Sequence, residues 1–247
     1  MFNRDELEQL LEKVASKIES PVKIYMIGGC ALSFKNLKAR TKDIDIIVTS
    51  QEDFNIFHKS MKENGFQPMG ERESEFYLTA LAVYKKDESR IDVFLKQVGK
   101  MLFLTKSMIK RAERYKKFGK LDVYLVSNED IFLFKTMTSR EGDILDCDKI
   151  MQGEVNYDII YGEIVEQSKE EGKRWFFWVY ENLCKLEDHN GIKIPIKNKV
   201  FELVKKYWSE RPSDFMDDVS DKAKHISEKK FLKELMRGKK SLYKLQQ

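Results

Sequence analysis

Three aspartates lie inside apolar stretches of the chain. Asp43 and Asp45 open the run DIDIIV, and Asp92 lies within RIDVF. Residues two apart in a strand point to the same face, so Asp43 and Asp45 project side by side. Adjacent carboxylates repel each other, and sharing a proton or a divalent cation relieves the repulsion. The spacing predicts that Asp43 and Asp45 bind a metal ion; the alternative is a pair of solvated carboxylates on an edge strand.

Asp92 lies between Ile91 and Val93, so it is a further acid inside an apolar strand. An unpaired acid there would be costly, and a salt bridge to Arg90 or to a lysine on a helix would compensate it. The chain has only three histidines and three cysteines, without ligand spacing. Carboxylates must therefore hold the metal, which favours Mg²⁺ or Mn²⁺.

Gly28 and Gly29 end the apolar run IYMI, thirteen residues before Asp43. A helix that begins at such a turn offers free N–H groups to a phosphate. The alternative is a tight turn between strand and helix that binds nothing. A phosphate site beside a metal site is typical of nucleotidyl or phosphoryl transfer.

Gly28, Gly29, Asp43, Asp45 and Asp92 together resemble the nucleotidyltransferase superfamily, which has the polymerase beta-like fold. That resemblance implies an α/β (α+β) fold, a mixed sheet with flanking helices followed by an α-helical C-terminal domain. It implies a metal-dependent transfer of a nucleoside monophosphate from a nucleoside triphosphate, such as ATP, to an acceptor hydroxyl. It also implies that Asp92 is the third carboxylate of the family, which completes the metal site or accepts a proton from the attacking hydroxyl. The alternative is a non-catalytic binding or regulatory protein with the same fold.

The segment RTKDIDI resembles most the branch that contains abortive-infection type toxins and uncharacterised minimal nucleotidyltransferases. That branch carries a helix with a lysine and an arginine, followed by two acids. Lys135, Arg140, Asp143 and Asp146 match this pattern, whereas Gly142 stands where lysine is usual. The resemblance implies a toxin that an antitoxin partner regulates, with Lys135 acting on the triphosphate or in catalysis. The alternative for Lys135 is a salt-bridge network that joins two helices.

Three further residues are candidates for nucleotide binding. Ser33 would reach a phosphate from the first turns of the helix, although a surface position is favoured. Arg40 and Lys42 flank the metal-binding strand and would neutralise triphosphate charge, although Lys42 can also point away.

Two basic segments give a weak indication of the acceptor. Residues 105–120 contain seven Lys or Arg and one acid, with Tyr115 and Phe118 among them, and residues 221–247 contain nine against three. Such segments can follow a phosphate backbone, or they can be solvated faces of a lysine-rich protein. RNA, including tRNA, is therefore the favoured acceptor, with a protein hydroxyl or a small molecule such as an antibiotic as alternatives.

The pattern of apolar residues predicts a boundary near residue 150. Residues 1–150 form the expected catalytic domain and residues 151–247 an α-helical domain. The scattered cysteines favour a reducing, cytoplasmic setting. No apolar run is long enough to span a membrane, and residues 5–19 form an acidic amphipathic helix rather than a signal peptide. The other expected elements are strands at 22–27, 43–48, 76–84, 90–95, 112–115 and 121–126, and helices at 29–36, 50–63, 105–111, 128–139, 140–152, 156–171, 173–187, 197–209 and 218–245.

A few residues mark the ends of these elements. Ser50 and Ser127 are the expected N-caps of two helices, and Gly65 is expected to end the first of them. Residues 85–88 are an expected turn between two strands.

Overall fold

A seven-stranded mixed sheet forms the first part of the chain in a computed structural model, which describes residues 1–69, 80–86, 89–98, 102–138, 140–169 and 175–210. The strand order is β3-β4-β5-β2-β1-β9-β8. The strands are β1 (Val22–Ile27), β2 (Asp43–Val48), β3 (Gln67–Pro68), β4 (Ala82–Lys86), β5 (Ser89–Leu95), β8 (Glu113–Phe118) and β9 (Leu121–Leu125); β6 (Gln97–Val98) and β7 (Leu102–Phe103) form a separate pair. β2 is antiparallel to β1 and parallel to β5. The predicted mixed α/β sheet is confirmed.

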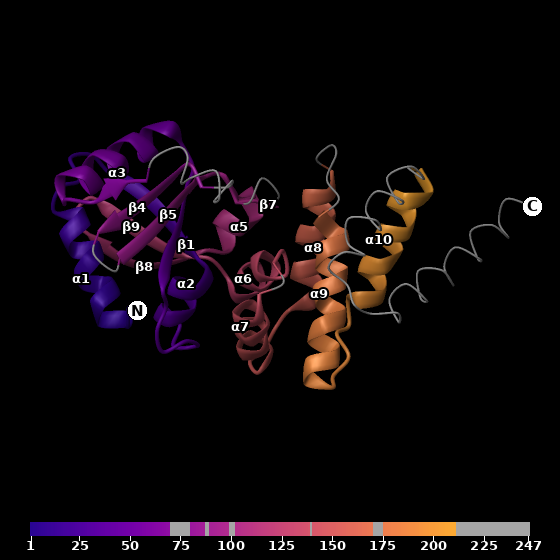
Figure 1. The fold of residues 1–247 in the computed structure, drawn as a ribbon. Coiled ribbons are helices and arrows are strands. Elements are labelled where there is room, and N and C mark those ends of the chain that lie inside the picture. Colours follow the sequence, from indigo (N-terminus) through magenta and orange to yellow (C-terminus); the bar gives the residue numbers. More distant parts are fainter. Residues whose placement is uncertain (70–79, 87–88, 99–101, 139, 170–174, 211–247) are drawn as a thin grey trace, which may run out of the picture.

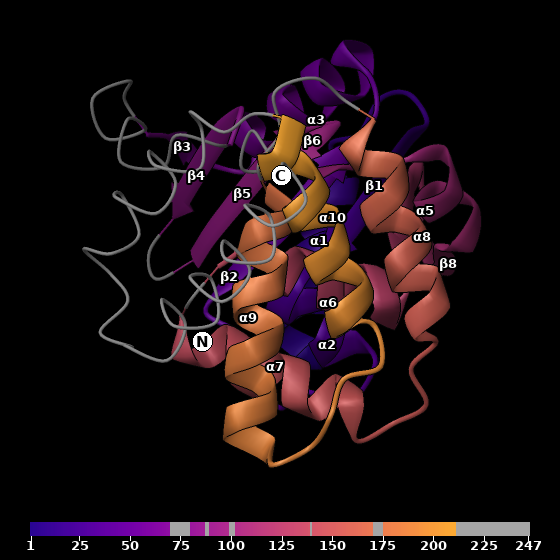
Figure 2. The same ribbon diagram turned by 90° about the vertical axis from the view of Figure 1, so that its right-hand side faces the viewer.

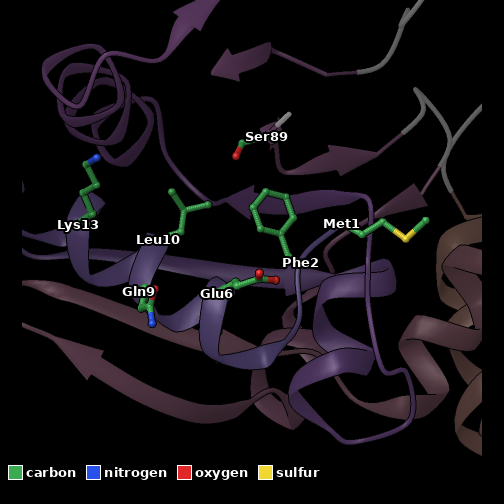
Figure 3. Close-up of a pocket in the computed structure, with 7 residues that line it drawn as sticks. All are labelled: Met1, Phe2, Glu6, Gln9, Leu10, Lys13 and Ser89. Carbon is green, nitrogen blue, oxygen red and sulfur yellow. The ribbon is translucent and has the colours of Figure 1, made fainter. Parts of the chain in front are cut away.

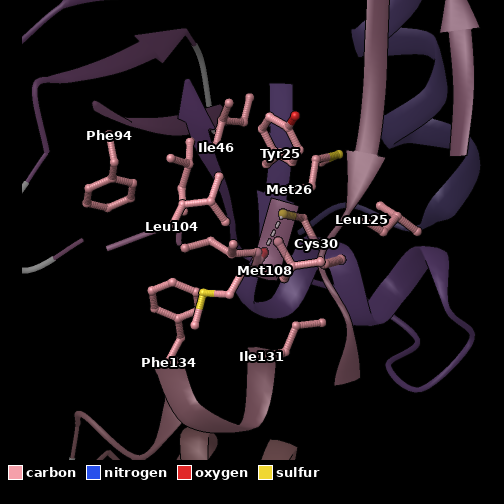
Figure 4. Packing of buried hydrophobic residues seen from close by; sticks show 14 of the residues in the cluster. Tyr25, Met26, Cys30, Ile46, Phe94, Leu104, Met108, Leu125, Ile131 and Phe134 are labelled. Carbon is pink, nitrogen blue, oxygen red and sulfur yellow. Dashed lines mark hydrogen bonds between the residues drawn. The ribbon is translucent and has the colours of Figure 1, made fainter. Parts of the chain in front are cut away.

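The central strands are buried because apolar side chains occupy both of their faces. In β1, every residue except Lys23 is buried, and β2 is buried from Ile46 to Val48. Continuous apolar runs of this kind are typical of strands covered on both sides. Figure 4 shows Met26 and Ile46 of these strands among the buried side chains that fill the core.

Helices cover the sheet and continue beyond it (Figure 1). They are α1 (Arg4–Ala15), α2 (Gly28–Phe34), α3 (Gln51–Glu63), α5 (Lys106–Arg111), α6 (Asn128–Lys135), α7 (Glu141–Met151), α8 (Tyr157–Ser168), α9 (Trp175–Asn190) and α10 (Lys197–Glu210). In Figure 1, α1 and α3 lie at one side of the sheet, and α6 and α7 lie between the sheet and α8, α9 and α10. Figure 2 looks onto these last three helices, which lie in front of the sheet.

Several predicted helix ends coincide with observed caps. The Ser50 side chain accepts from the Asp53 N–H, and the Ser127 side chain accepts from the Asp130 N–H. These bonds satisfy N–H groups that have no partner within the helix. Gly65, expected to end α3, has a φ of +81° just after the helix, a region that favours glycine.

Two predicted boundaries are wrong. The turn expected at Lys85 and Lys86 is part of β4, because both residues pair with the start of β5. The helix expected to reach Ser139 ends at Lys135, where the Thr136 N–H bonds the Phe132 carbonyl. Residues 76–79 of the strand expected at 76–84, and all of the helix expected at 218–245, lie outside the described residues.

A buried polar group, the Arg111 cluster (Arg111, Asp130 and Glu163), joins α5, α6 and α8. Arg111 Nη2 lies 2.7 Å from Asp130 Oδ1 and 2.6 Å from Glu163 Oε1. The Asp130 and Glu163 side chains are 1% and 3% exposed. Hydroxyls satisfy their remaining oxygens: Thr105 and Ser107 donate to Glu163, and Ser127 donates to Asp130.

The helical region after residue 150 packs on the same core as the sheet. The hydrophobic cluster runs from Leu7 to Val204 and includes Ile160, Ile164 and Val200. The predicted boundary near residue 150 stays a prediction. Among the described helices, none combines the length and the apolar character that crossing a bilayer requires.

Candidate active site

The register of β2 and β5 brings together the three strand carboxylates, Asp43, Asp45 and Asp92. Asp45 lies directly opposite Asp92, and Asp43 lies opposite Arg90. Paired residues on neighbouring strands project from the same face, so all four side chains emerge together. The alternation of acidic and apolar residues, read from the sequence, is what positions them.

Arg90 binds Asp92 through two hydrogen bonds. Its Nε donates to Asp92 Oδ1 at 2.8 Å, and its Nη2 donates to Oδ2 at 2.6 Å. A guanidinium and a carboxylate paired in this way form a strong, directional contact. Burial raises the pKa of Asp92, whereas Arg90 lowers it. Asp92 is therefore a buried carboxylate that already has a counter-ion.

Asp45 has no such partner. No hydrogen bond or ion pair joins its carboxylate to a side chain in the described part of the chain, and the same holds for Asp43. Burial is the main cause that raises the pKa of Asp45 to about 7. The charges of Asp92 and Asp43 also raise this pKa, whereas those of Lys135 and Arg140 lower it. Asp45 is thus a carboxylate at which a cation would be strongly stabilised.

Gly28 lies against the Asp45 carboxylate. A Cβ on Gly28 would come within 2.6 Å of Asp45 Oδ2, and the φ of Gly28 is +63°. Any side chain here would be strained and would also displace Asp45. Gly28 therefore lets the turn between β1 and α2 close over this carboxylate.

Gly29 gives the same close approach to the segment before β2. Its Cβ would lie 2.6 Å from Thr41 Oγ1 and 3.6 Å from Lys38 Nζ. Thr41 Oγ1 donates to the Asp43 carbonyl at 2.9 Å, which fixes the start of β2. Both glycines are buried, and their contact with a phosphate stays a prediction.

A lysine–aspartate network (Lys38, Lys135, Arg140, Asp143 and Asp146) lies beside the strand carboxylates. Lys135 Nζ is 2.5 Å from Asp143 Oδ1 and 2.8 Å from Asp146 Oδ2. Arg140 Nε donates to Asp143 Oδ2 at 2.7 Å, and the Thr138 hydroxyl bonds the same oxygen. Lys38 Nζ donates to both Asp146 oxygens, at 2.7 and 2.8 Å. The salt-bridge network considered for Lys135 is therefore present, and the charge of Lys135 also lowers the pKa of Asp45.

The nucleotide contacts expected of Ser33, Arg40 and Lys42 stay predictions. Ser33 is 3% exposed, so the favoured surface position is wrong, and its Oγ has no partner among the described residues. Arg40 donates to the Met1 carbonyl at 2.7 Å and lies 3.4 Å from Glu6. Lys42 is exposed and makes no ion pair within the described chain.

The side of the sheet near α1 also carries a cavity of about 370 Å³. Its lining residues are Met1, Phe2, Glu6, Gln9, Leu10, Lys13 and Ser89 (Figure 3). Ser89 and Asp92 are three apart in β5, so their side chains leave opposite faces of the strand. The cavity is therefore separate from the strand carboxylates.

Three of the seven cations in the first basic segment pair with acids of the described chain: Arg111, Arg114 and Lys116. Lys116 contacts Glu8 at 2.8 Å, Arg114 Nε donates to Asp122 at 2.9 Å, and the Tyr115 hydroxyl bonds Glu8. Phe118 is 6% exposed. Neither ring offers an open face for stacking on a base. The second basic segment lies outside the described residues.

Lys38 is a neighbour of the site that no pattern in the sequence indicated. Lys38 lies in the connection between α2 and β2, and its partner Asp146 is 108 residues away. No local periodicity links two such positions, because the contact depends on how α7 packs against the sheet.

No group of three or more His, Cys, Asp or Glu side chains in the described residues converges closely enough to hold a metal ion. The donor set nevertheless fits Mg²⁺, which commonly takes one or two carboxylates together with substrate phosphates. Asp43 and Asp45 supply two carboxylates without counter-ions.

Comparisons with known proteins give a family match and distant structural likenesses. A family model described as "Nucleotidyltransferase of unknown function (DUF6036)" matches residues 5–183. The crystal structure of ANT(2″)-Ia in complex with adenylyl-2″-tobramycin is 12% identical, with a TM-score of 0.45, over 65% of this chain and 96% of that one. A solution structure of the antibiotic-resistance factor ANT(2″)-Ia is 10% identical, with a TM-score of 0.46, over 68% and 94%. No curated protein sequence matches the chain.

Proposed function

The chain belongs to this nucleotidyltransferase family, and on that premise we propose that it catalyses a metal-dependent transfer of a nucleoside monophosphate from a nucleoside triphosphate to an acceptor hydroxyl. The observation that carries the proposal is the pair Asp43 and Asp45. Both lie near Asp92 on adjacent parallel strands, and neither carboxylate forms an ion pair or a hydrogen bond with a described side chain. A fold keeps half-buried carboxylates without direct partners only at a cost, so such a pair is typical of a functional site.

Asp43 and Asp45 are the proposed ligands of a Mg²⁺ or Mn²⁺ ion. When bound, the ion would neutralise phosphate charge and help to orient the triphosphate. The pKa of Asp45, about 7, falls when a cation is near, because the cation favours the charged carboxylate. Metal binding and loss of the Asp45 proton are therefore coupled.

Asp92 is the proposed proton acceptor rather than a metal ligand. Arg90 occupies both of its oxygens, but a carboxylate has lone pairs beyond those two bonds. Burial raises its pKa, which makes it a better base than an exposed aspartate. Arg90 would hold it in a fixed orientation.

The triphosphate would lie between the turn at Gly28 and Gly29 and the exposed end of the lysine–aspartate network. Arg140 provides that end, with 74% of its side chain exposed. The acceptor oxygen attacks the α-phosphorus, the bond from that phosphorus to the bridging oxygen breaks, and pyrophosphate leaves. The acceptor proton passes to Asp92. Positioning and electrostatics supply the catalysis.

RNA stays the favoured acceptor through the two basic segments, and the first gives less support than its sequence suggested. Arg114, Tyr115 and Lys116 of that segment are paired with acids of the chain. The toxin role and its antitoxin partner rest on the resemblance of RTKDIDI and the Lys135 region alone, and they stay predictions.

The test is a transfer assay with each α-labelled nucleoside triphosphate, Mg²⁺ or Mn²⁺, and an extract of total RNA, protein and small molecules. We expect label in an acceptor together with release of pyrophosphate. Sensitivity of the label to ribonuclease or to protease then assigns the acceptor class. Binding of metal and nucleotide without any transfer would favour the non-catalytic alternative.

A further inference from the structure

The lysine–aspartate network carries more positive charge than its own acids require. Two buried aspartates, Asp143 and Asp146, are 4% and 7% exposed at their side chains. Three cations contact them: Lys38, Lys135 and Arg140. Lys135, 11% exposed, already contacts both acids. The two remaining cations lie at the ends of the network, and both ends reach solvent.

Both ends of the network lie near the strand carboxylates. At one end, the charge of Arg140 acts on Asp45 and Asp43. At the other end, Lys38 Nζ lies 3.6 Å from the position of a Cβ on Gly29. The neighbouring Gly28 lies against Asp45. Lys38 therefore lies beside the glycine turn that contacts this carboxylate.

Lys38 retains a donor for a ligand. An ammonium group has three N–H donors, and two of those on Lys38 point to the oxygens of Asp146. The Lys38 side chain is 31% exposed. Asp146 holds the ammonium group beside Gly29 and leaves one N–H directed elsewhere.

A purely structural role for Lys38 explains these facts less well. Asp146 has Lys135 as a counter-ion at 2.8 Å, so the fold does not need a second cation to neutralise it. An ion pair that is partly exposed to solvent also contributes little to stability, and Lys38 is the more exposed partner of this pair. Excess positive charge, ordered and partly exposed beside a glycine turn, is what an anionic ligand requires.

We propose that Lys38 binds a non-transferred phosphate of the nucleoside triphosphate, and that Asp146 is the positioning residue that holds it there. This proposal rests on the proposed function, since it assigns a residue to the same substrate. Lys38 would contact the β- or γ-phosphate, and Arg140 would face the substrate from the other end of the network.

The test is isothermal titration calorimetry on the full chain with Mg²⁺. The probes are the α,β-methylene analogues of the four ribonucleoside triphosphates and the corresponding monophosphates. Lys38→Met removes the charge, and Lys38→Gln keeps a donor for Asp146 without the charge. Lys35→Met is the matched control, because Lys35 is half-buried at the end of α2 and forms no ion pair within the described chain.

Lys38→Met and Lys38→Gln are both expected to weaken triphosphate binding at least about tenfold, the scale of one lost charged hydrogen bond. Monophosphate binding should stay within about twofold of the wild type by the same arithmetic, and Lys35→Met should change neither. Thermal melting of Lys38→Gln near the wild-type temperature excludes an effect through unfolding.

Triphosphate affinity of Lys38→Gln equal to that of the wild type would overturn the assignment, and Lys38 would then be a structural tie. Equal weakening of monophosphate and triphosphate binding would also overturn it. A wild-type chain that binds no triphosphate with Mg²⁺ would remove the proposed function itself, and this assignment with it. The experiment therefore separates the two failures.

Discussion

The strand carboxylates and the Arg111 cluster both place acidic side chains inside the fold, but the two groups of acids differ in their partners. Asp43 and Asp45 are half-buried, whereas Asp130 and Glu163 are buried. Asp130 and Glu163 share Arg111 and accept hydrogen bonds from three hydroxyls. The carboxylates of Asp43 and Asp45 form no ion pair and accept no hydrogen bond from a hydroxyl of the described residues. Burial raises the pKa of Asp130 and that of Asp45 alike, but in Asp130 the Arg111 side chain directly opposes the shift.

That difference separates a structural use of buried charge from a functional one. A buried acid that is paired and hydrogen-bonded adds little to the free-energy cost of folding, whereas removal of its partner destabilises the fold strongly. An unpaired acid destabilises the fold until a ligand arrives. The two regions should therefore respond in opposite ways when one charge is removed from each.

The largest effect is expected at Arg111. Arg111→Met leaves Asp130 and Glu163 buried without a counter-ion, and we expect a loss of about 3–5 kcal/mol in the free energy of unfolding. Chemical denaturation measures it. Arg114→Met is the control, because that pair lies at an exposed edge and should cost about 0–1 kcal/mol. Similar losses for the two variants would contradict the comparison.

The next largest effect is expected on activity at Asp45. Asp45→Asn should reduce transfer by at least about a hundredfold, the scale for one lost group that stabilises transition-state charge. Its unfolding free energy at neutral pH should equal or exceed that of the wild type, because an uncompensated charge is gone. Asp122→Asn, a sheet aspartate paired with Arg114, should keep its activity. Comparable losses of activity in Asp45→Asn and Asp122→Asn would contradict the distinction between unpaired and paired aspartates.

The unfolding free energy of the metal-free protein should depend on pH in a way that shows the missing partner of Asp45. The pKa of Asp45 is raised from 3.8 to about 7, so the folded chain binds the proton more tightly than the unfolded chain. Its contribution to the unfolding free energy therefore falls as pH rises from about 4 to about 7. Asp45→Asn lacks this fall. Near pH 4 the variant and the wild type should be equally stable, and at pH 8 the variant should be more stable by at least ~1.4 kcal/mol, one pKa unit.

The opposite trend, with the wild type gaining stability relative to Asp45→Asn as pH rises, would show that the folded chain lowers this pKa. Asp45 would then have a cationic partner, and it would resemble Asp130.

The smallest effect is expected at Ser33, whose buried Oγ has no described partner. Ser33→Ala removes an unsatisfied hydroxyl and should leave the unfolding free energy unchanged or raise it slightly. Thr105→Ala, in the Arg111 cluster, removes a bond to Glu163 and one to the Met108 N–H, and should cost about 1 kcal/mol. A drop in nucleotide affinity for Ser33→Ala would support the phosphate contact that its position in the sequence suggested.

Local patterns in the sequence predicted the elements and their acids well. The alternation in DIDIIV and RIDVF placed Asp43, Asp45 and Asp92 on one face, because strand geometry has a period of two. Ser50 and Ser127 marked helix starts for an equally local reason. These features depend on neighbours within a few residues.

Contacts between distant segments could not be predicted in this way. Lys38 meets Asp146 only because α7 packs beside the connection from α2 to β2. Every residue of α2 is buried, including Ser33, and the seven-residue sequence of this helix does not indicate that. Arg40 carries no signal that it would bond the Met1 carbonyl rather than face the metal-binding strand.

The central claim is that the unpaired carboxylates of β2 hold a divalent cation. Mn²⁺ binding, followed by electron paramagnetic resonance with and without a nucleoside triphosphate, tests it most directly. We expect wild-type chain and Asp122→Asn to bind Mn²⁺ alike, more tightly with the nucleotide, and Asp45→Asn to lose that binding while it remains folded. Mn²⁺ bound by Asp45→Asn as tightly as by the wild type would contradict the account.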